Sequence, residues 1–204
     1  MMVLAVIITL VLGVACGRFF FPPEWIALSD QLANIALILL ILSIGIDVGT
    51  RRDVFQKMKE YNIKVFLIPF GVVAGSLLTG TLCGVLMGVE APTSAAISAG
   101  MGWYSLSSVL LKDMAGVQAG TLSLLSNLFR EIFSFILIPF LAKYISPYTA
   151  IASAAATSED TTLAFISKYT TADVTVMAVI NGVICSALVP ILTPLVYDIF
   201  ALFC

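Results

Sequence analysis

The sequence contains no histidine, and only 11% of its residues are charged. Histidine is the side chain that most often changes protonation near neutral pH and most often binds metals. Any proton carrier in this protein must therefore be a carboxylate. The four cysteines, Cys16, Cys83, Cys185 and Cys204, are scattered without CxxC or metal-ligand spacing. We interpret them as small apolar packing residues.

Catalytic and nucleotide-binding motifs are also lacking. The glycines at Gly100 and Gly102 have neither the third glycine nor the preceding strand of a dinucleotide site, so we interpret them as a helix break. Serines such as Ser105 and Ser158 have no histidine or mid-membrane lysine to activate them. We therefore expect a protein that is not an enzyme, needs no cofactor and binds no nucleic acid.

Apolar residues make up 60% of the chain, and its mean hydropathy is +1.09. A soluble domain of this size carries about 25% charged residues, and it needs polar surface to cover its core. The apolar residues here come in blocks long enough to cross a bilayer. The fold class predicted is an all-α polytopic membrane protein.

The N-terminal part predicts two transmembrane helices, at 2–21 and 28–48, separated by a turn at Pro22–Pro23. The next segment, GTRRDVFQKMKEYNIK, holds half of the chain's 10 lysine and arginine residues. Short basic loops stay in the cytoplasm, which predicts a cytoplasmic N-terminus. This pattern divides the chain into 1–50, a basic cytoplasmic loop at 51–63, and 64–204.

The part from 64 to 204 alternates long apolar helices, at 64–89, 119–144 and 172–203, with two segments rich in small residues. In the first helix, two G-x-x-x-G pairs favour close internal packing over a dimer interface. The two small-residue segments, SAAISAGMGWYSLSS and ASAAATSEDTT, align with each other and set Asn127 opposite Asn181. This indicates an internal repeat, with coincidence of composition as the alternative.

Broken segments at matching positions of two repeats are typical of transporter binding sites. We predict about 6–8 transmembrane helices including the two broken or re-entrant segments. If both broken segments cross the membrane, the chain has seven spans and its C-terminus is outside.

Two charge pairs, Arg130–Glu131 and Glu159–Asp160, interrupt apolar or small-residue runs. An ionisable residue at membrane depth is costly and persists where it faces a protein interior or a water path. Asn127 can share a helix face with the first pair. A carboxylate of the second pair is the candidate partner for Arg130, because it matches the guanidinium fork. The alternative is an ion-pair lattice that only holds helices together.

One arginine against three carboxylates leaves a deficit of positive charge. Such a site takes up protons or attracts a cation, which favours a cationic or proton-coupled pathway over an anion channel. Trp103 and Tyr104 are either interfacial aromatics or, beside the break, cation–π partners for an ammonium group.

The segments SAGMGWYSLSSVLL, SNLFREIFSFILIPFL, ATSEDTTLAF and INGVICSALVPIL resemble the LysO lysine exporter family of bacterial inner membranes. The resemblance covers roughly 63–204 and implies a transport core that exports L-lysine and its analogues in exchange for protons. Other members have a longer N-terminal half. This difference leaves open whether the chain works alone, as a homodimer or with a small membrane partner.

The resemblance and the residues together give a candidate site for L-lysine or another cationic amino acid. In it Arg130 binds the carboxylate, Asp160 is favoured over Glu159 as the functional acid, and neutral side chains supply hydrogen bonds. The substrate-binding or proton-coupling residues predicted are Arg130, Asp160, Glu131, Glu159, Asn127, Trp103, Tyr104, Ser105, Ser158 and Asn181.

We therefore expect a secondary transporter of the bacterial cytoplasmic membrane. Two other classes stay open: an accessory or structural subunit of a larger complex, and a channel or transporter for another cationic solute. Carboxylates serve H⁺ and Na⁺ alike, so both ions remain candidates for coupling, with H⁺ favoured.

Overall fold

The computed structural model describes residues 66–203 and a few isolated positions between residues 8 and 50. The isolated positions have helical backbone. Otherwise the predicted helices at 2–21 and 28–48 and the basic loop at 51–63 lie outside the described residues. The chain divides into two compact units, Met1–Ser43 and Ile44–Cys204. The fold below is that of the second unit.

Three helices of this unit are long and apolar enough to cross a membrane. They are α4 (Leu67–Leu86), α7 (Val117–Tyr144) and α10 (Ala172–Phe203). Large apolar side chains such as Leu78 and Phe133 remain exposed on them, as expected for surfaces that face lipid. The described residues of the unit form helices and turns alone, which confirms the predicted all-α membrane class.

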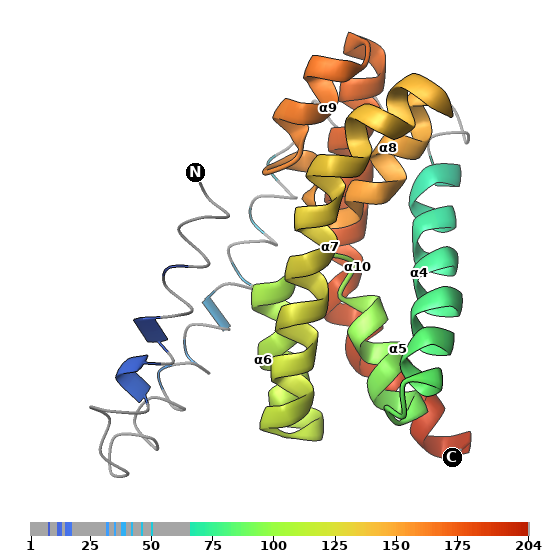
Figure 1. Ribbon diagram of the computed structural model, residues 1–204. Helices are drawn as coiled ribbons and strands as arrows, with labels where there is room; N and C mark the ends of the chain where they lie inside the picture. Colours follow the sequence, from blue (N-terminus) through green and yellow to red (C-terminus); the bar gives the residue numbers. More distant parts are fainter. Residues whose placement is uncertain are drawn as a thin grey trace. The chain divides into compact units, whose positions relative to one another are not determined.

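A short helical hairpin precedes α7, and another precedes α10. The first hairpin consists of α5 (Ala91–Ala99) and α6 (Tyr104–Ala115). The second consists of α8 (Pro147–Ala154), the 3-10 turn η2 (Ala155–Glu159) and α9 (Leu163–Tyr169). Figure 1 shows α5 and α6 along the lower halves of the long helices and α8 and α9 along the upper halves.

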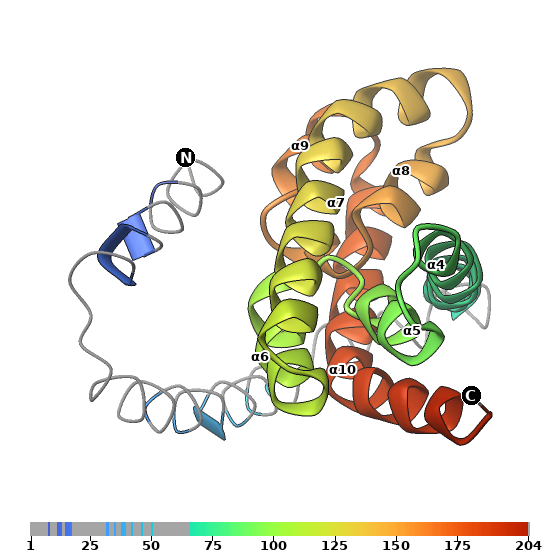
Figure 2. The same cartoon turned by 60° about the horizontal axis from the view of Figure 1, so that its bottom comes forward.

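Each hairpin returns to the end of the bundle from which it came. The α6 helix runs back along the first half of α7, where the hydroxyl of Ser123 donates to Ser107 Oγ over 3.1 Å. The α8 helix runs back along the second half of α7, where Ser134 Oγ donates to the Ser153 carbonyl over 2.7 Å. Both predicted broken segments therefore re-enter, from opposite ends, and the seven-span arrangement with two full crossings does not form (Figure 2).

The tips of the hairpins meet between the long helices. There the backbone N–H of Ala156 donates to the carbonyl of Met101 over 3.1 Å. Met101 has φ of 47° and Ala155 has φ of 53°, a left-handed conformation that side chains disfavour. These two strained residues are 54 positions apart (155 − 101), as are Asn127 and Asn181 (181 − 127).

These matching positions support the predicted repeat, and they set its register one residue short of the predicted 55. Because the hairpins enter from opposite ends, the two repeats have inverted orientations, an arrangement known from transporter folds.

The glycines of α4 fall into two groups. A Cβ on Gly84 would lie 2.6 Å from the Cβ of Ser94, and one on Gly80 would lie 2.9 Å from the Cβ of Ser98, so this half of α4 packs closely on α5. A Cβ on Gly71 or Gly75 would meet no atom within 4 Å. The predicted close internal packing is thus confirmed for the second G-x-x-x-G pair, whereas the first pair faces open space among the described residues.

We expect Gly84→Ala to lower the thermal stability of the detergent-purified protein, because an added methyl at a close helix contact costs about 1–3 kcal/mol. The matched control, Gly75→Ala, adds the same methyl to open space, so its unfolding temperature should be unchanged or higher. Equal losses from both substitutions would contradict the packing described here.

Candidate functional site

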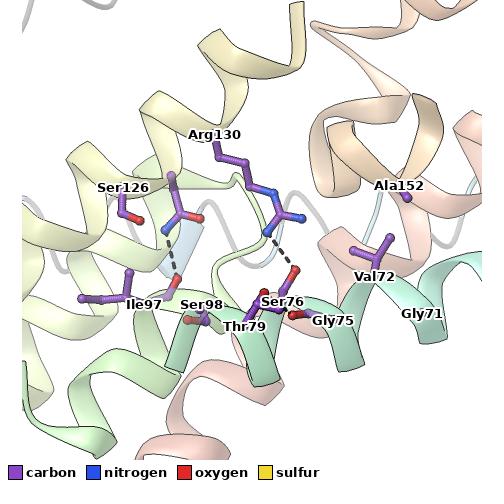
Figure 3. A pocket seen from close by; sticks show the side chains of 12 residues that line it. Gly71, Val72, Gly75, Ser76, Thr79, Ile97, Ser98, Ser126, Arg130 and Ala152 are labelled. Carbon is purple, nitrogen blue, oxygen red and sulfur yellow. Dashed lines mark hydrogen bonds between the residues drawn. The ribbon is translucent and has the colours of Figure 1, made fainter. Parts of the chain in front are cut away.

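A cavity of about 450 Å³ lies beside the hairpin tips, between α4, α5, α7 and α8 (Figure 3). Its walls are made mainly of glycines and small hydroxyl-bearing side chains, with one charged group. The lining residues are Gly71, Val72, Gly75, Ser76, Thr79, Gly80, Ile97, Ser98, Ser126, Asn127, Arg130 and Ala152.

Arg130 projects from the middle of α7 into this cavity (Figure 3). Its Nη1 donates to the hydroxyl of Ser76 on α4 over 2.8 Å. The predicted carboxylate partners bind elsewhere: Glu159 Oε1 accepts a hydrogen bond from Ser186 over 2.8 Å, and Asp160 Oδ1 accepts one from the backbone N–H of Thr161. Among the described residues, the hydrogen-bond partner of the guanidinium is thus a neutral hydroxyl instead of an acid.

Asn127 binds the backbone of the first hairpin from one turn below Arg130. Its Oδ1 accepts from the N–H of Gly102 over 2.7 Å, and its Nδ2 lies 3.2 Å from the carbonyl of Ile97 and 3.3 Å from Ser107 Oγ. Only 3% of Asn127 is exposed. A buried N–H or carbonyl without a partner is costly, so this amide makes the break tolerable at membrane depth.

Asn181 has the corresponding place in the second repeat. Its Nδ2 donates to the Ala155 carbonyl and to Ser158 Oγ, both over 3.0 Å. Ser158 in turn donates to the Ala178 carbonyl over 2.8 Å. The predicted residues Asn181 and Ser158 therefore serve the second tip, as Asn127 serves the first.

Glu131 belongs to a second polar group, outside the residues that line the cavity. Its side chain is 2% exposed, and its Oε2 has no hydrogen-bond partner among the described residues. The Asp160 carboxylate, the Thr161 side chain and the Tyr104 hydroxyl are within electrostatic reach of it. The structure thus brings Glu131, Asp160 and Tyr104 into one group, with Asp160 exposed at the second tip.

Glu159 belongs to a third group, against α10. A Cβ on Gly182 would lie only 2.6 Å from the backbone nitrogen of Glu159. The absence of a side chain at Gly182 therefore allows the second tip to approach α10 closely. Cys185, one turn further along, is within electrostatic reach of both Arg130 and Glu159. Trp103 is half-buried at the start of α6 and Ser105 is exposed there, and neither lines the cavity.

Sequence reasoning missed the hydroxyls around Arg130, which come from Ser76, Thr79, Ser98 and Ser126. A signal for two of them exists: Ser76 and Thr79 fall between glycines of one small-residue face of α4. The resulting cavity has one cation and several hydroxyls but no carboxylate on its described walls. It suits an anionic group, while the acids beside it suit a cationic one.

Comparisons with known proteins identify the family of this chain. The family model described as "Lysine exporter LysO" matches residues 7–197. The "Lysine exporter LysO" of Escherichia coli K12 is 32% identical over 164 residues, which are 80% of this chain and 54% of the relative. The "Putative lysine exporter" of Haemophilus influenzae Rd is 34% identical over 191 residues, which are 92% of each chain. No solved structure matches.

The chain thus spans about half the length of the first relative and nearly all of the second.

We expect Arg130→Met to leave the unfolding temperature unchanged or to raise it. The guanidinium is half-buried, and its hydrogen-bond partner among the described residues is one neutral hydroxyl, so this contact contributes little and an apolar side chain of similar length is no less stable there. The comparison variant is Ser134→Ala, which loses the hydrogen bond to Ser153 and should cost about 1 kcal/mol. A large loss of stability in Arg130→Met would instead favour the ion-pair lattice.

Proposed function

Because the chain belongs to the lysine exporter LysO family, we propose that it is a secondary transporter that exports L-lysine and its analogues across the cytoplasmic membrane in exchange for protons. The observation that carries this proposal is the meeting of two oppositely oriented re-entrant hairpins beside a half-buried arginine. Irregular backbone at membrane depth is tolerated where it lines a pathway. A protein that only held helices together would not need broken helices in its centre.

The proposed carboxylate site is Arg130 with the hydroxyls around it. Nη1 of the guanidinium donates a hydrogen bond to the neutral Ser76 hydroxyl. A substrate carboxylate would accept a stronger, charge-assisted hydrogen bond than this hydroxyl does. The cavity volume of about 450 Å³ is in the range of small-molecule sites.

The proposed site for positive charge is the acidic group on the other side of α7. Glu131 and Asp160 either neutralise a substrate ammonium group or bind the coupling ion. Because the two carboxylates are close together, binding of the ammonium group and binding of the coupling ion exclude each other, which couples the two. Tyr104 supplies a hydroxyl and an aromatic ring beside them. Protons are the proposed coupling ion, with Na⁺ as the alternative for the same carboxylates.

The proposed cytoplasmic end of the bundle is the one where α7 ends and α10 begins. Lys143 and Lys168 lie in the last turns of α7 and α9 at this end, and α4 begins there after the basic loop (Figure 1). Lys112, followed directly by Asp113, lies at the opposite end. This distribution follows the positive-inside rule and supports a C-terminus on the outside. With the two helices predicted before the basic loop, the proposed N-terminus is cytoplasmic.

An accessory membrane subunit is the second candidate function. It is favoured by one observation: the chain aligns with only 54% of its Escherichia coli relative. In that case a second copy or a small partner supplies the remaining helices, and the isolated chain binds no lysine.

Binding and counterflow of lysine test the proposal against this alternative. Purified protein should gain about 2.7 kcal/mol of stability at a lysine concentration 100 times the dissociation constant. Reconstituted vesicles should show lysine counterflow that Arg130→Ala abolishes and the exposed control Asp113→Asn leaves intact. Absence of both stabilisation and counterflow would favour the accessory subunit, and conductance that lysine does not saturate would favour a channel.

Coupling is tested separately in the same vesicles. An imposed proton gradient should drive lysine against its own gradient in the unmodified protein. Asp160→Asn should reduce this response at least about tenfold, because a neutral amide cannot carry the coupling ion as a carboxylate does. Accumulation driven by a Na⁺ gradient alone would identify Na⁺ as the coupling ion and contradict the proton assignment.

A further inference from the structure

The two hairpin tips are held by the same kind of residue but in different ways. Asn127 reaches the whole first hairpin: the carbonyl of Ile97 in α5, the N–H of Gly102 in the break and the hydroxyl of Ser107 in α6. The Ser123 hydroxyl adds a second bond to Ser107. Both arms and the tip of this hairpin are therefore tied to α7.

Asn181 reaches only the tip of the second hairpin. Its two acceptors, the Ala155 carbonyl and Ser158 Oγ, both lie in η2. The α8 arm has a hydrogen bond to α7 through Ser134. Against α10, the α9 arm packs by apolar contact alone among the described interactions, with Ile166 in one cluster with Val174 and Ala178.

The second hairpin is also the less regular of the two. A 3-10 turn forms its tip, and this tip carries the exposed Asp160. By contrast, α5 of the first hairpin is mostly buried, and Gly80 and Gly84 fix it against α4.

Elements that open in a folded protein are those with few buried contacts and few hydrogen bonds to the rest. In the second hairpin this describes the α9 arm, where Ile166 is the buried residue. The tip itself is bound to α10 by Ser158 and Glu159 as well as through Asn181.

We propose that the second hairpin (147–169) is the moving gate of this transporter, that Asn181 is the positioning residue that latches its tip closed, and that the first hairpin (91–115) stays fixed by Asn127. The gate opens toward the end of the bundle that carries Lys143 and Lys168. This proposal rests on the proposed transport function for its role, but the motion itself is measurable without lysine.

The chain contains a reporter for this motion. Cys185 is fully buried, and its Sγ lies 3.8 Å from Asn181 Oδ1, directly behind the latched tip. Water-soluble thiol reagents reach it only after the tip has moved away from α10. Replacing Cys16, Cys83 and Cys204 by serine leaves Cys185 as the one reactive thiol.

The experiment measures the rate at which a membrane-impermeant maleimide labels Cys185 in sealed vesicles of either orientation. Asn181→Ala should raise this rate at least about tenfold, because it removes two of the four described hydrogen bonds between the tip and α10. Asn127→Ala, the matched control in the first repeat, should leave the labelling rate of Cys185 unchanged. Asn181→Asp, which keeps the side-chain volume but not the donor, should behave like Asn181→Ala.

The side of labelling separates a gate from a loosened fold. A Lys168→Cys variant in a background with Cys185 also replaced by serine marks the end at which the second hairpin is based. Cys185 of Asn181→Ala should be labelled from that side only, with an unfolding temperature close to that of the parent. Labelling from both sides, or an equal rise in Asn127→Ala, would overturn the proposal.

Lysine then links the gate to the transport function. If both hold, saturating lysine changes the labelling rate of the unmodified protein. A gate that labels as expected but ignores lysine would contradict the proposed substrate and leave the gate standing. Lysine counterflow with no change of labelling in either Asn181 variant would contradict the gate and leave the transport function standing.

Discussion

Backbone groups that have no helical partner must still be satisfied inside a membrane, and the centre of this protein is built around that requirement. Two helices end there and two begin, which frees N–H and carbonyl groups where water is scarce. The bond from Ala156 to Met101 satisfies one pair of them, and the amides of Asn127 and Asn181 satisfy others. A side-chain amide suits this task because it donates and accepts at once. The position of everything else near the centre follows from these contacts.

The order of charges along α7 decides how the polar groups separate. Successive residues of a helix point about 100° apart, so Arg130 and Glu131 cannot face the same neighbour. Arg130 faces the cavity beside α4, while Glu131 faces the group that contains Asp160 and Tyr104. Separate sites for opposite charges, a few residues apart, match a ligand that is itself charged at both ends.

The sequence was enough to predict the membrane class, the three long helices and the two breaks, because length, hydropathy and glycine each report on local structure. It also set Asn127 opposite Asn181, since a repeat leaves the same residue type at the same register. The break at Ala155 has no glycine, so only the repeat indicated a break in this segment.

Contacts between distant segments were beyond sequence reasoning. Nothing in the pattern of α4 distinguishes a serine that binds Arg130 from one that bonds its own helix. The pairing of Arg130 with an acid was the reasonable prediction from charge alone, and the three-dimensional path of the hairpins excluded it. The helices before residue 51 and the roles of the candidate site residues stay predictions.

The seam between the two hairpin tips has an electrical consequence. Since the hairpins reach it from opposite faces, any water that follows them brings each bulk phase close to the same thin layer. The membrane potential, about 2.3 kcal/mol per unit charge for every 100 mV, then falls mainly across that layer instead of across the full bilayer. Arg130, Glu131 and Asp160 lie beside it. Where water fills both approaches, a charge that moves by only a few ångströms at the tips crosses most of the transmembrane potential.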